Sequence, residues 1–196
     1  MAKRRNKAIA PYEHMIASRH AELSSRLRPG GGCWFFTANL LDRRSRLLTE
    51  SIDALRDAVS QVRRRHPFHI DAFVVLPDHI HTMWTLPPGD TDFSLRWRLI
   101  KMGFAKSLPK TECLDPVRRA RGERCIWQRR YWEHLIKDEE DYRRHVEYCY
   151  INPMKHGHVA RVQDWPFSSF HRDVGAGLFP ADWAGDLRQL GDYGEA

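Results

Sequence analysis

The chain has little cysteine and no long apolar segment. Only four of its 196 residues are cysteines and none of them forms a CxxC pair, which argues against a zinc ribbon or a dithiol redox motif. No apolar run reaches the roughly 18 residues of a membrane-spanning helix, and no apolar stretch follows the basic first residues as it would in a secretion signal. We therefore expect a cytoplasmic protein with reduced thiols and no membrane segment.

Acidic residues are fewer than basic ones, 25 against 32, so the net charge is +7. Such an excess favours a polyanionic partner through counterion release. The basic residues come in bursts, at positions 3–5, 43–46, 63–65, 118–124 and 129–130. The last burst lies among aromatic residues, and unstacked bases of single strands pack on such side chains. A solvated basic surface explains any one burst but explains five less well, so nucleic acid is the expected partner.

A run of three glycines after Pro29 predicts a joint near residue 30. We therefore expect three parts. Residues 1–30 form a basic extension, residues 31–160 form one compact domain, and residues 161–196 form a tail that is rich in aromatic residues.

Strand and helix patterns alternate within the compact domain. Strands are expected at 33–38, 70–76 and 79–86 and within 125–136, and helices at 47–65, 93–108 and 138–152. This order predicts an α+β fold with a ferredoxin-like, four-stranded antiparallel sheet. Helices are expected on one face, and the last helix near the other, open face. Residues 109–124 are expected to form a charged loop.

The sequence His79-Ile80-His81 follows a predicted tight turn at the start of the third strand. Alternate residues of a strand point to the same face, so both imidazoles are expected on the open face, where they could share a cation. Two surface histidines without a metal are the alternative interpretation.

In the last helix, the apolar positions predict a core-facing stripe. Tyr142, Val146, Cys149 and Tyr150 make up this stripe. Tyr148 falls well off the stripe, and Asn152 lies one turn later on the same side as Tyr148. A phenol and an amide at this spacing can both address one cation-bound phosphate, with the phenol as nucleophile and Asn152 as a possible third ligand. An exposed surface tyrosine is the alternative.

Four motifs, taken in order, resemble the REP-associated tyrosine transposases, which belong to the His-hydrophobe-His class of single-tyrosine transposases. The motifs are residues 77–81 (PDHIH), 127–134 (WQRRYWEH), 148–153 (YCYINP) and 164–169 (DWPFSS). The resemblance runs from about residue 31 to residue 170. Residues 31–160 would then be the transposase catalytic domain.

The resemblance implies cleavage and rejoining of single-stranded DNA through a 5′-phosphotyrosine link. Tyr148 matches the nucleophile, His79 and His81 the metal pair, and Asn152 the polar residue one turn after the tyrosine, where related transposases carry a glutamine ligand. Imidazole ligands suit manganese, and magnesium with retained water also remains open.

The resemblance also implies a partner, single-stranded DNA with hairpin-forming repeats, and a nucleoid-associated location in the cytoplasm. Six residues are candidate DNA contacts: Arg118, Arg119, Trp127, Arg129, Arg130 and Trp165. Monomer and homodimer are both open.

Two other function classes remain open. A sheet of this type can bind single-stranded RNA on exposed aromatic residues without catalysis, although two histidines and a methionine are expected on that face. A metal-dependent nuclease that uses water is the second. A Tyr148→Phe change separates them, because it stops a transposase and spares a hydrolase. A domesticated protein that binds DNA without moving it also remains open.

Overall fold

The computed structural model describes residues 32–110, 124–186 and 193 of the chain. The predicted extension at 1–30, most of the predicted loop at 109–124, and the candidate contacts Arg118 and Arg119 lie outside the described residues. None of the described helices is long and apolar enough to cross a membrane.

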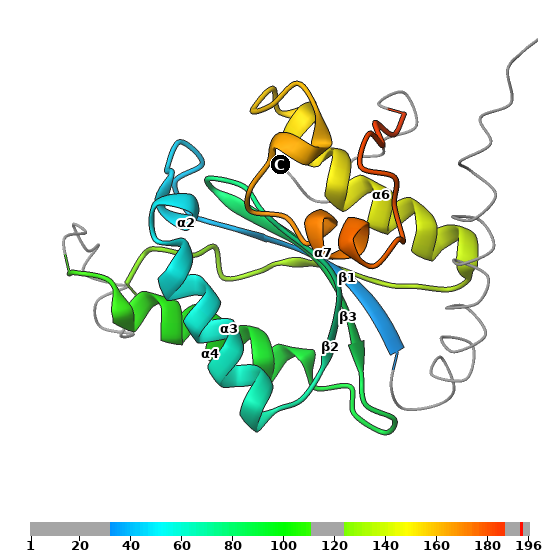
Figure 1. The fold of residues 1–196 in the computed structure, drawn as a ribbon. Helices are drawn as coiled ribbons and strands as arrows, with labels where there is room; N and C mark the ends of the chain where they lie inside the picture. The colour runs from blue at the N-terminus through cyan, green and yellow to red at the C-terminus, as the bar shows by residue number, and fades with distance from the viewer. Residues whose placement is uncertain (1–31, 111–123, 187–192, 194–196) are drawn as a thin grey trace, which may run out of the picture.

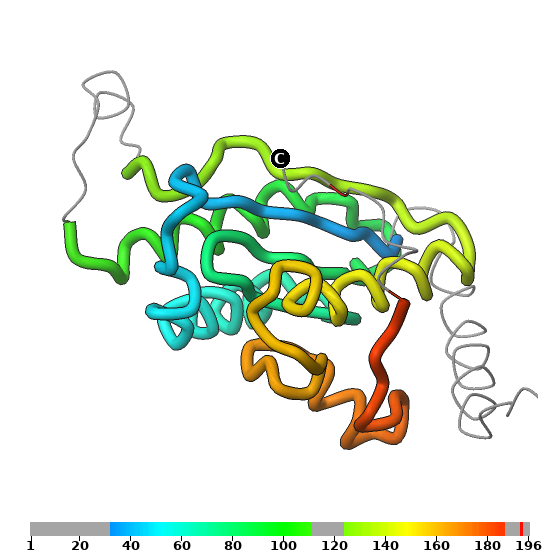
Figure 2. The backbone as a smooth tube through the Cα atoms, turned by 90° about the horizontal axis from the view of Figure 1, so that it is seen from above, coloured from blue at the N-terminus to red at the C-terminus, as the bar shows by residue number. Residues whose placement is uncertain are grey.

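Four strands form one antiparallel sheet. They are β1 (Gly32–Asn39), β2 (His69–Val75), β3 (His79–Leu86) and β4 (Trp132–Leu135). Their order is β2-β3-β1-β4, which is the ferredoxin-like order, so the predicted fold class is confirmed. The central strands β1 and β3 pair along their whole length, and Thr37 stands opposite His81. Figure 2 shows β4 and the residues before it running alongside β1.

Two helices, α3 (Ile52–Arg65) and α4 (Phe93–Ser107), cover one face of the sheet (Figure 1). A short α2 (Leu47–Glu50) precedes α3 and is separated from it by Ser51, where one continuous helix was expected. Asp92 caps α4 as predicted, since its carboxylate accepts from the Leu95 N–H at 2.9 Å. The helices bury the β3 residues Ile80, Trp84 and Leu86. This is the face of β3 that was expected to be covered by helices.

The opposite face is not open, and that expectation is wrong. Helix α6 (Glu139–Lys155), the 3-10 turn η1 (Val162–Asp164) and α7 (Phe170–Gly175) lie over it (Figure 1). The physical reason is that β1 and β3 also point apolar side chains to this side. Phe35 and Met83 are fully buried beneath these elements, and leaving them in water would forfeit their burial energy.

Helix α6 does not end at residues 152–153 as predicted, but continues through Pro153 to Lys155. A proline inside a helix removes one backbone hydrogen bond. The turn nevertheless closes, because the N–H of His156 donates to the carbonyl of Asn152 at 3.0 Å. The extra turn brings Lys155 and His156 to the end of the helix that carries Tyr148.

The segment after α6 pairs with the free edge of β2. The N–H of Val75 donates to the carbonyl of Phe167 at 2.9 Å, and the N–H of Ser169 donates to the carbonyl of Phe73 at 2.8 Å. The Trp165 indole N–H adds a bond to the carbonyl of Val75 at 3.0 Å. The described part of the expected tail therefore packs on the same core and covers an exposed sheet edge.

Candidate active site

His79 and His81 lie on the same face of β3, as the strand alternation predicts, and both point toward α6. Their ring centroids are 4.8 Å apart. Both side chains are almost fully buried. Burial lowers the pKa of His79, despite the opposing effect of Asp78, and lowers the pKa of His81 well below its ordinary value. Both imidazoles are therefore neutral at pH 7, which is the form that binds a metal.

Asp78 orients His79. Its carboxylate lies 2.8 Å from Nδ1 of the ring, and Arg43 forms an ion pair with the same carboxylate at 3.2 Å. Burial alone would raise the pKa of Asp78, but the hydrogen bond with His79 and the charge of Arg43 lower it overall. An ionised carboxylate accepts only, so Nδ1 carries the proton and Nε2 carries the lone pair.

Thr37 orients His81 in the same way. The Thr37 hydroxyl donates its one proton to the carbonyl of Tyr193 at 2.6 Å. At 2.9 Å from Nδ1 of His81 it must therefore accept a hydrogen bond. This assigns the His81 proton to Nδ1 as well, so both histidines present Nε2 to the space beneath α6.

Tyr148 lies beside His81, with ring centroids 5.1 Å apart. The expectation that it falls outside the packed side of α6 is wrong, since its side chain is only 1% exposed. The α6 stripe that was expected to point away from the core is buried against the sheet instead. The Tyr148 side chain borders a cavity of about 30 Å³, which Trp183 and Tyr193 also line, so the buried phenol lies next to a small void.

Three further residues surround this point. Asn152, one turn after Tyr148, is fully buried and adjoins His79. Lys155 donates to the Tyr148 hydroxyl at 3.3 Å. The His156 ring lies 5.1 Å from that of His79, and burial lowers its pKa to about 4. The sequence interpretation missed Lys155 and His156, although Lys155 stands seven residues after Tyr148 and so shares its helix face.

The donor set fits a divalent cation. Nε2 of His79 is buried and makes no hydrogen bond among the described residues, which is costly unless a ligand uses its lone pair. The second imidazole and the amide oxygen of Asn152 lie on the same side of the sheet. Two imidazoles with an amide oxygen suit manganese or a similar ion.

A second group, His134, Asp141 and His145, links β4 to α6 near this site. The Asp141 carboxylate contacts Nε2 of His134 at 2.7 Å and Nδ1 of His145 at 3.1 Å. The two rings are stacked at 4.7 Å with 16° between their planes. The ligand atoms of these three residues lie within 4.8 Å of one another, which is the spacing of a group that could hold a metal ion. Without an ion, the contacts of Asp141 with both histidines connect β4 to α6.

The candidate DNA contacts are divided between surface and core. Arg129 and Arg130 are exposed just before β4. Trp127 is half-buried against Phe104, at 5.5 Å, with the Lys101 ammonium over its ring at 5.7 Å. Trp165 is buried and its indole N–H bonds to the backbone. The structure thus gives both tryptophans packing partners and leaves the two arginines accessible.

Comparisons with known proteins agree on one family. A scan against family models finds no match. The REP-associated tyrosine transposase of Escherichia coli (strain K12) is 55% identical over 157 residues, which is 80% of this chain and 87% of that protein. A Haemophilus influenzae (strain Rd) protein described under the same family name is 46% identical over 166 residues, 83% of this chain and 94% of its own length.

A solved structure is also similar. The REP-associated tyrosine transposase bound to a REP hairpin matches with a TM-score of 0.73 and 53% identity, covering 84% of this chain and 92% of that one.

Proposed function

The chain belongs to the REP-associated tyrosine transposases and is a DNA transposase. From this premise we propose that it cleaves and rejoins hairpin-associated single-stranded DNA with Tyr148 as nucleophile. The proposal rests on the proximity of Tyr148 to the histidine pair. The centroids of the Tyr148 and His81 rings are 5.1 Å apart, and His79 lies beside His81. The hairpin partner is supported by the relative that is bound to a REP hairpin. We expect the enzyme to act on DNA in the cytoplasm.

His79, His81 and Asn152 would hold a divalent cation, Mg²⁺ or Mn²⁺. When bound, the cation would polarise a phosphoryl oxygen of the scissile phosphate. Asp78 keeps His79 in the tautomer that presents Nε2, and Thr37 holds the His81 ring through its contact with Nδ1. Both residues therefore contribute orientation rather than contact with DNA.

In the cleavage step, the Tyr148 hydroxyl releases its proton to solvent, its oxygen forms a bond to phosphorus, and the bond from phosphorus to the preceding 3′-oxygen breaks. The 3′-oxygen takes up one proton from solvent and leaves as a hydroxyl, and the 5′-phosphate remains on the tyrosine. Rejoining is the reverse attack by a 3′-hydroxyl. Lys155, which already donates to the Tyr148 oxygen, stabilises the negative charge on that oxygen in both directions.

A phosphate can reach Tyr148 only if the cover over the phenol opens. Tyr193 packs on the Tyr148 ring at 4.5 Å, and its carbonyl accepts from Thr37. DNA binding must therefore displace Tyr193 from the space between α6 and the sheet before the chemistry begins.

The test is a denaturing gel of a labelled single-stranded hairpin incubated with protein and Mn²⁺. We expect a shifted, protease-sensitive band from a covalent complex. Tyr148→Phe should abolish the band. Tyr142→Phe is the matched control, because this tyrosine lies in the same helix, is also buried and directs its hydroxyl to Asp71 at 3.3 Å, and it should keep the band.

Two outcomes would contradict the proposal. Cleavage without a covalent band, unaffected by Tyr148→Phe, would indicate a hydrolase that uses water. Binding without cleavage, over several hairpins and metal ions, would indicate a binding module.

A further inference from the structure

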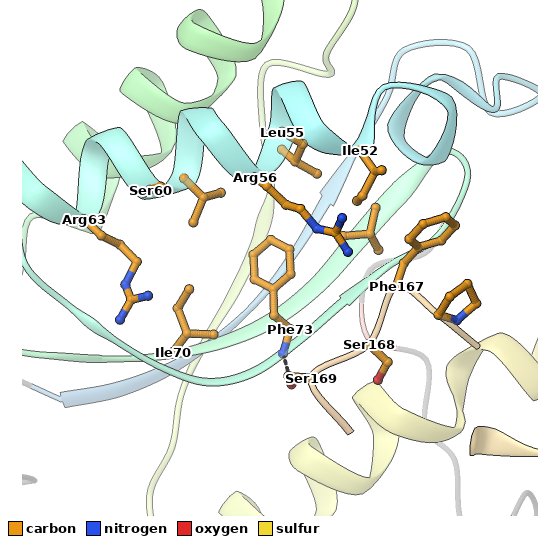
Figure 3. Close-up of a pocket in the computed structure, with 13 residues that line it drawn as sticks. Ile52, Leu55, Arg56, Ser60, Arg63, Ile70, Phe73, Phe167, Ser168 and Ser169 are labelled. Atoms are coloured by element: carbon orange, nitrogen blue, oxygen red, sulfur yellow. Dashed lines mark hydrogen bonds between the residues drawn. The ribbon is translucent and has the colours of Figure 1, made fainter. Parts of the chain in front are cut away.

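A cavity of about 280 Å³ lies between α3, the edge strand β2 and residues 166–169 (Figure 3). Val75 lines it and stands opposite Ile80 in the sheet, so the cavity lies on the α3 side and away from the histidine face. The volume far exceeds the ~30 Å³ of a water molecule. It approaches the lower end, about 300 Å³, of pockets that hold small molecules, so one flat ring system fits.

The walls are apolar and carry two aromatic rings. Aliphatic side chains from α3 and β2 form the floor, and Phe73 and Phe167 face the open space (Figure 3). Phe73 and Phe167 are only half-buried. Half-exposed aromatic faces in a concave site are unusual for a protein surface and favour stacking of a planar ligand.

The rim is positively charged. None of the described residues that line the cavity is acidic, and two are arginines, Arg56 and Arg63. Figure 3 shows both side chains extending from α3 on either side of the Phe73 ring. The guanidinium of Arg63 is anchored by a 3.3 Å bond from Nε to the carbonyl of Phe68. Arg56 also contacts the exposed Asp53 at 3.1 Å, so Arg63 supplies the stronger part of the field.

We propose that this cavity receives one unpaired base of the bound DNA strand. The base would stack on Phe73 and Phe167, and the phosphates on either side of it would lie at Arg63 and Arg56. An apolar side chain of a protein partner would fill the walls equally well but would bring no anionic group to Arg63, whose hydrogen bond from Nε goes to a backbone carbonyl. The combination of aromatic walls and a cationic rim matches a single nucleotide.

The inference rests on the DNA-binding part of the proposed function and not on the chemistry of Tyr148. The experiment is therefore done in Tyr148→Phe protein, where no strand is cut. The probe is a hairpin oligonucleotide with single-stranded flanks, in which each unpaired nucleotide in turn is replaced by an abasic one. Binding is measured by fluorescence anisotropy for Tyr148→Phe alone and with Phe73→Leu added.

At the nucleotide that enters the cavity, the loss of binding caused by the abasic substitution and the loss caused by Phe73→Leu should not add. We expect Phe73→Leu to weaken binding of the intact oligonucleotide by between about five-fold and a hundred-fold, the range expected for loss of one stacked base. With the abasic nucleotide at the position that enters the cavity, Phe73→Leu should have no further effect. Phe167→Leu should couple to the same position. Leucine keeps the apolar packing, and thermal unfolding checks that each variant is folded.

Charge is tested separately. Arg63→Gln should weaken binding and reduce its salt dependence. Arg98→Gln, which removes an exposed arginine of α4 outside the cavity, should do so much less. Equal loss at every abasic position, or no loss on Phe73→Leu, would overturn the proposal. A missing covalent band in the gel assay would overturn only the tyrosine mechanism.

Discussion

At the scale of single residues, the sequence did not reveal Lys155, which contacts the oxygen of the proposed nucleophile Tyr148. Its ammonium donates to the Tyr148 oxygen at 3.3 Å and lies 5.1 Å from the ring centroid. Lys155→Met should slow formation of the covalent complex by about ten- to hundred-fold, because one charge-stabilising donor is lost, while DNA affinity changes little. Single-turnover gel assays at saturating DNA measure this rate.

Lys155→Arg, which keeps a cationic donor, should restore part of the rate. Lys106→Met, at an exposed lysine of α4, is the control for lost positive charge and should be near wild type. A wild-type rate in Lys155→Met would show that the hydrogen bond to Tyr148 has no part in the reaction.

Asp78 gives a second prediction at this scale. It fixes the His79 tautomer through a 2.8 Å contact, and partners of this kind contribute about ten- to hundred-fold to metal affinity. Asp78→Asn should therefore weaken Mn²⁺ binding by about ten-fold, as measured by calorimetric titration. Asp42→Asn, at an exposed aspartate that pairs with Arg44, should leave the affinity unchanged. Unchanged affinity in Asp78→Asn would argue against His79 as a ligand.

At the scale of elements, the sequence predicted what local patterns encode. Alternation predicted the strand that carries His79 and His81, and capping predicted Asp92 and Asp138. The sheet topology was predicted from the order of strands and helices along the chain, and all of these features are present. The cover over the histidines was not predictable in this way, because the burial of both faces of a strand depends on which distant segment packs there. Pro153 also misled, since a proline ends most helices but not α6.

The pairing of residues 167–169 with β2 depends on Ser169. Its hydroxyl accepts from the backbone N–H of Phe73 at 2.8 Å and lies 3.2 Å from the Tyr150 hydroxyl. Ser169→Ala should lower the free energy of unfolding by about 1–3 kcal/mol, since the Phe73 N–H then has no protein partner in this segment. Urea denaturation measures the loss.

Ser60→Ala is the matched control, because the hydroxyl of Ser60 accepts a hydrogen bond from the exposed Arg64 at 2.9 Å. It should change stability by much less than Ser169→Ala. Equal stability of the two variants would mean that solvent replaces the Ser169 hydrogen bond at no cost.

At the scale of the whole molecule, the sheet separates two apolar cores. One lies beneath α3 and α4, and the other beneath α6 and the segment that follows it. The second core contains the candidate site, so the proposed catalytic groups are also core residues. His79, His81 and His145 are each at most 2% exposed, and the stability of the fold is therefore linked to their protonation.

The sign of this linkage follows from the direction of the pKa shifts. Burial lowers the pKa of His79, His81 and His145 below the ordinary 6.5. Below about pH 6.5 the unfolded chain takes up protons that the folded chain does not, so stability falls as the pH falls toward the lowered folded values. Each such group contributes at most about 1.4 kcal/mol per pH unit.

Calorimetry without metal should thus show Tm dropping between pH 7.5 and pH 5.5. Of these three histidines, His145 is the one outside the proposed metal ligands. His145→Gln should therefore give a smaller drop in Tm over this pH range, whatever the stability of the variant at pH 7.5. Mn²⁺ should raise Tm at pH 7.5, because it binds the neutral imidazoles of the folded state, and this gain should shrink as protons compete for the same nitrogens. A Tm that does not change across this range would mean that the buried histidines accept protons in the folded protein as readily as in the unfolded chain.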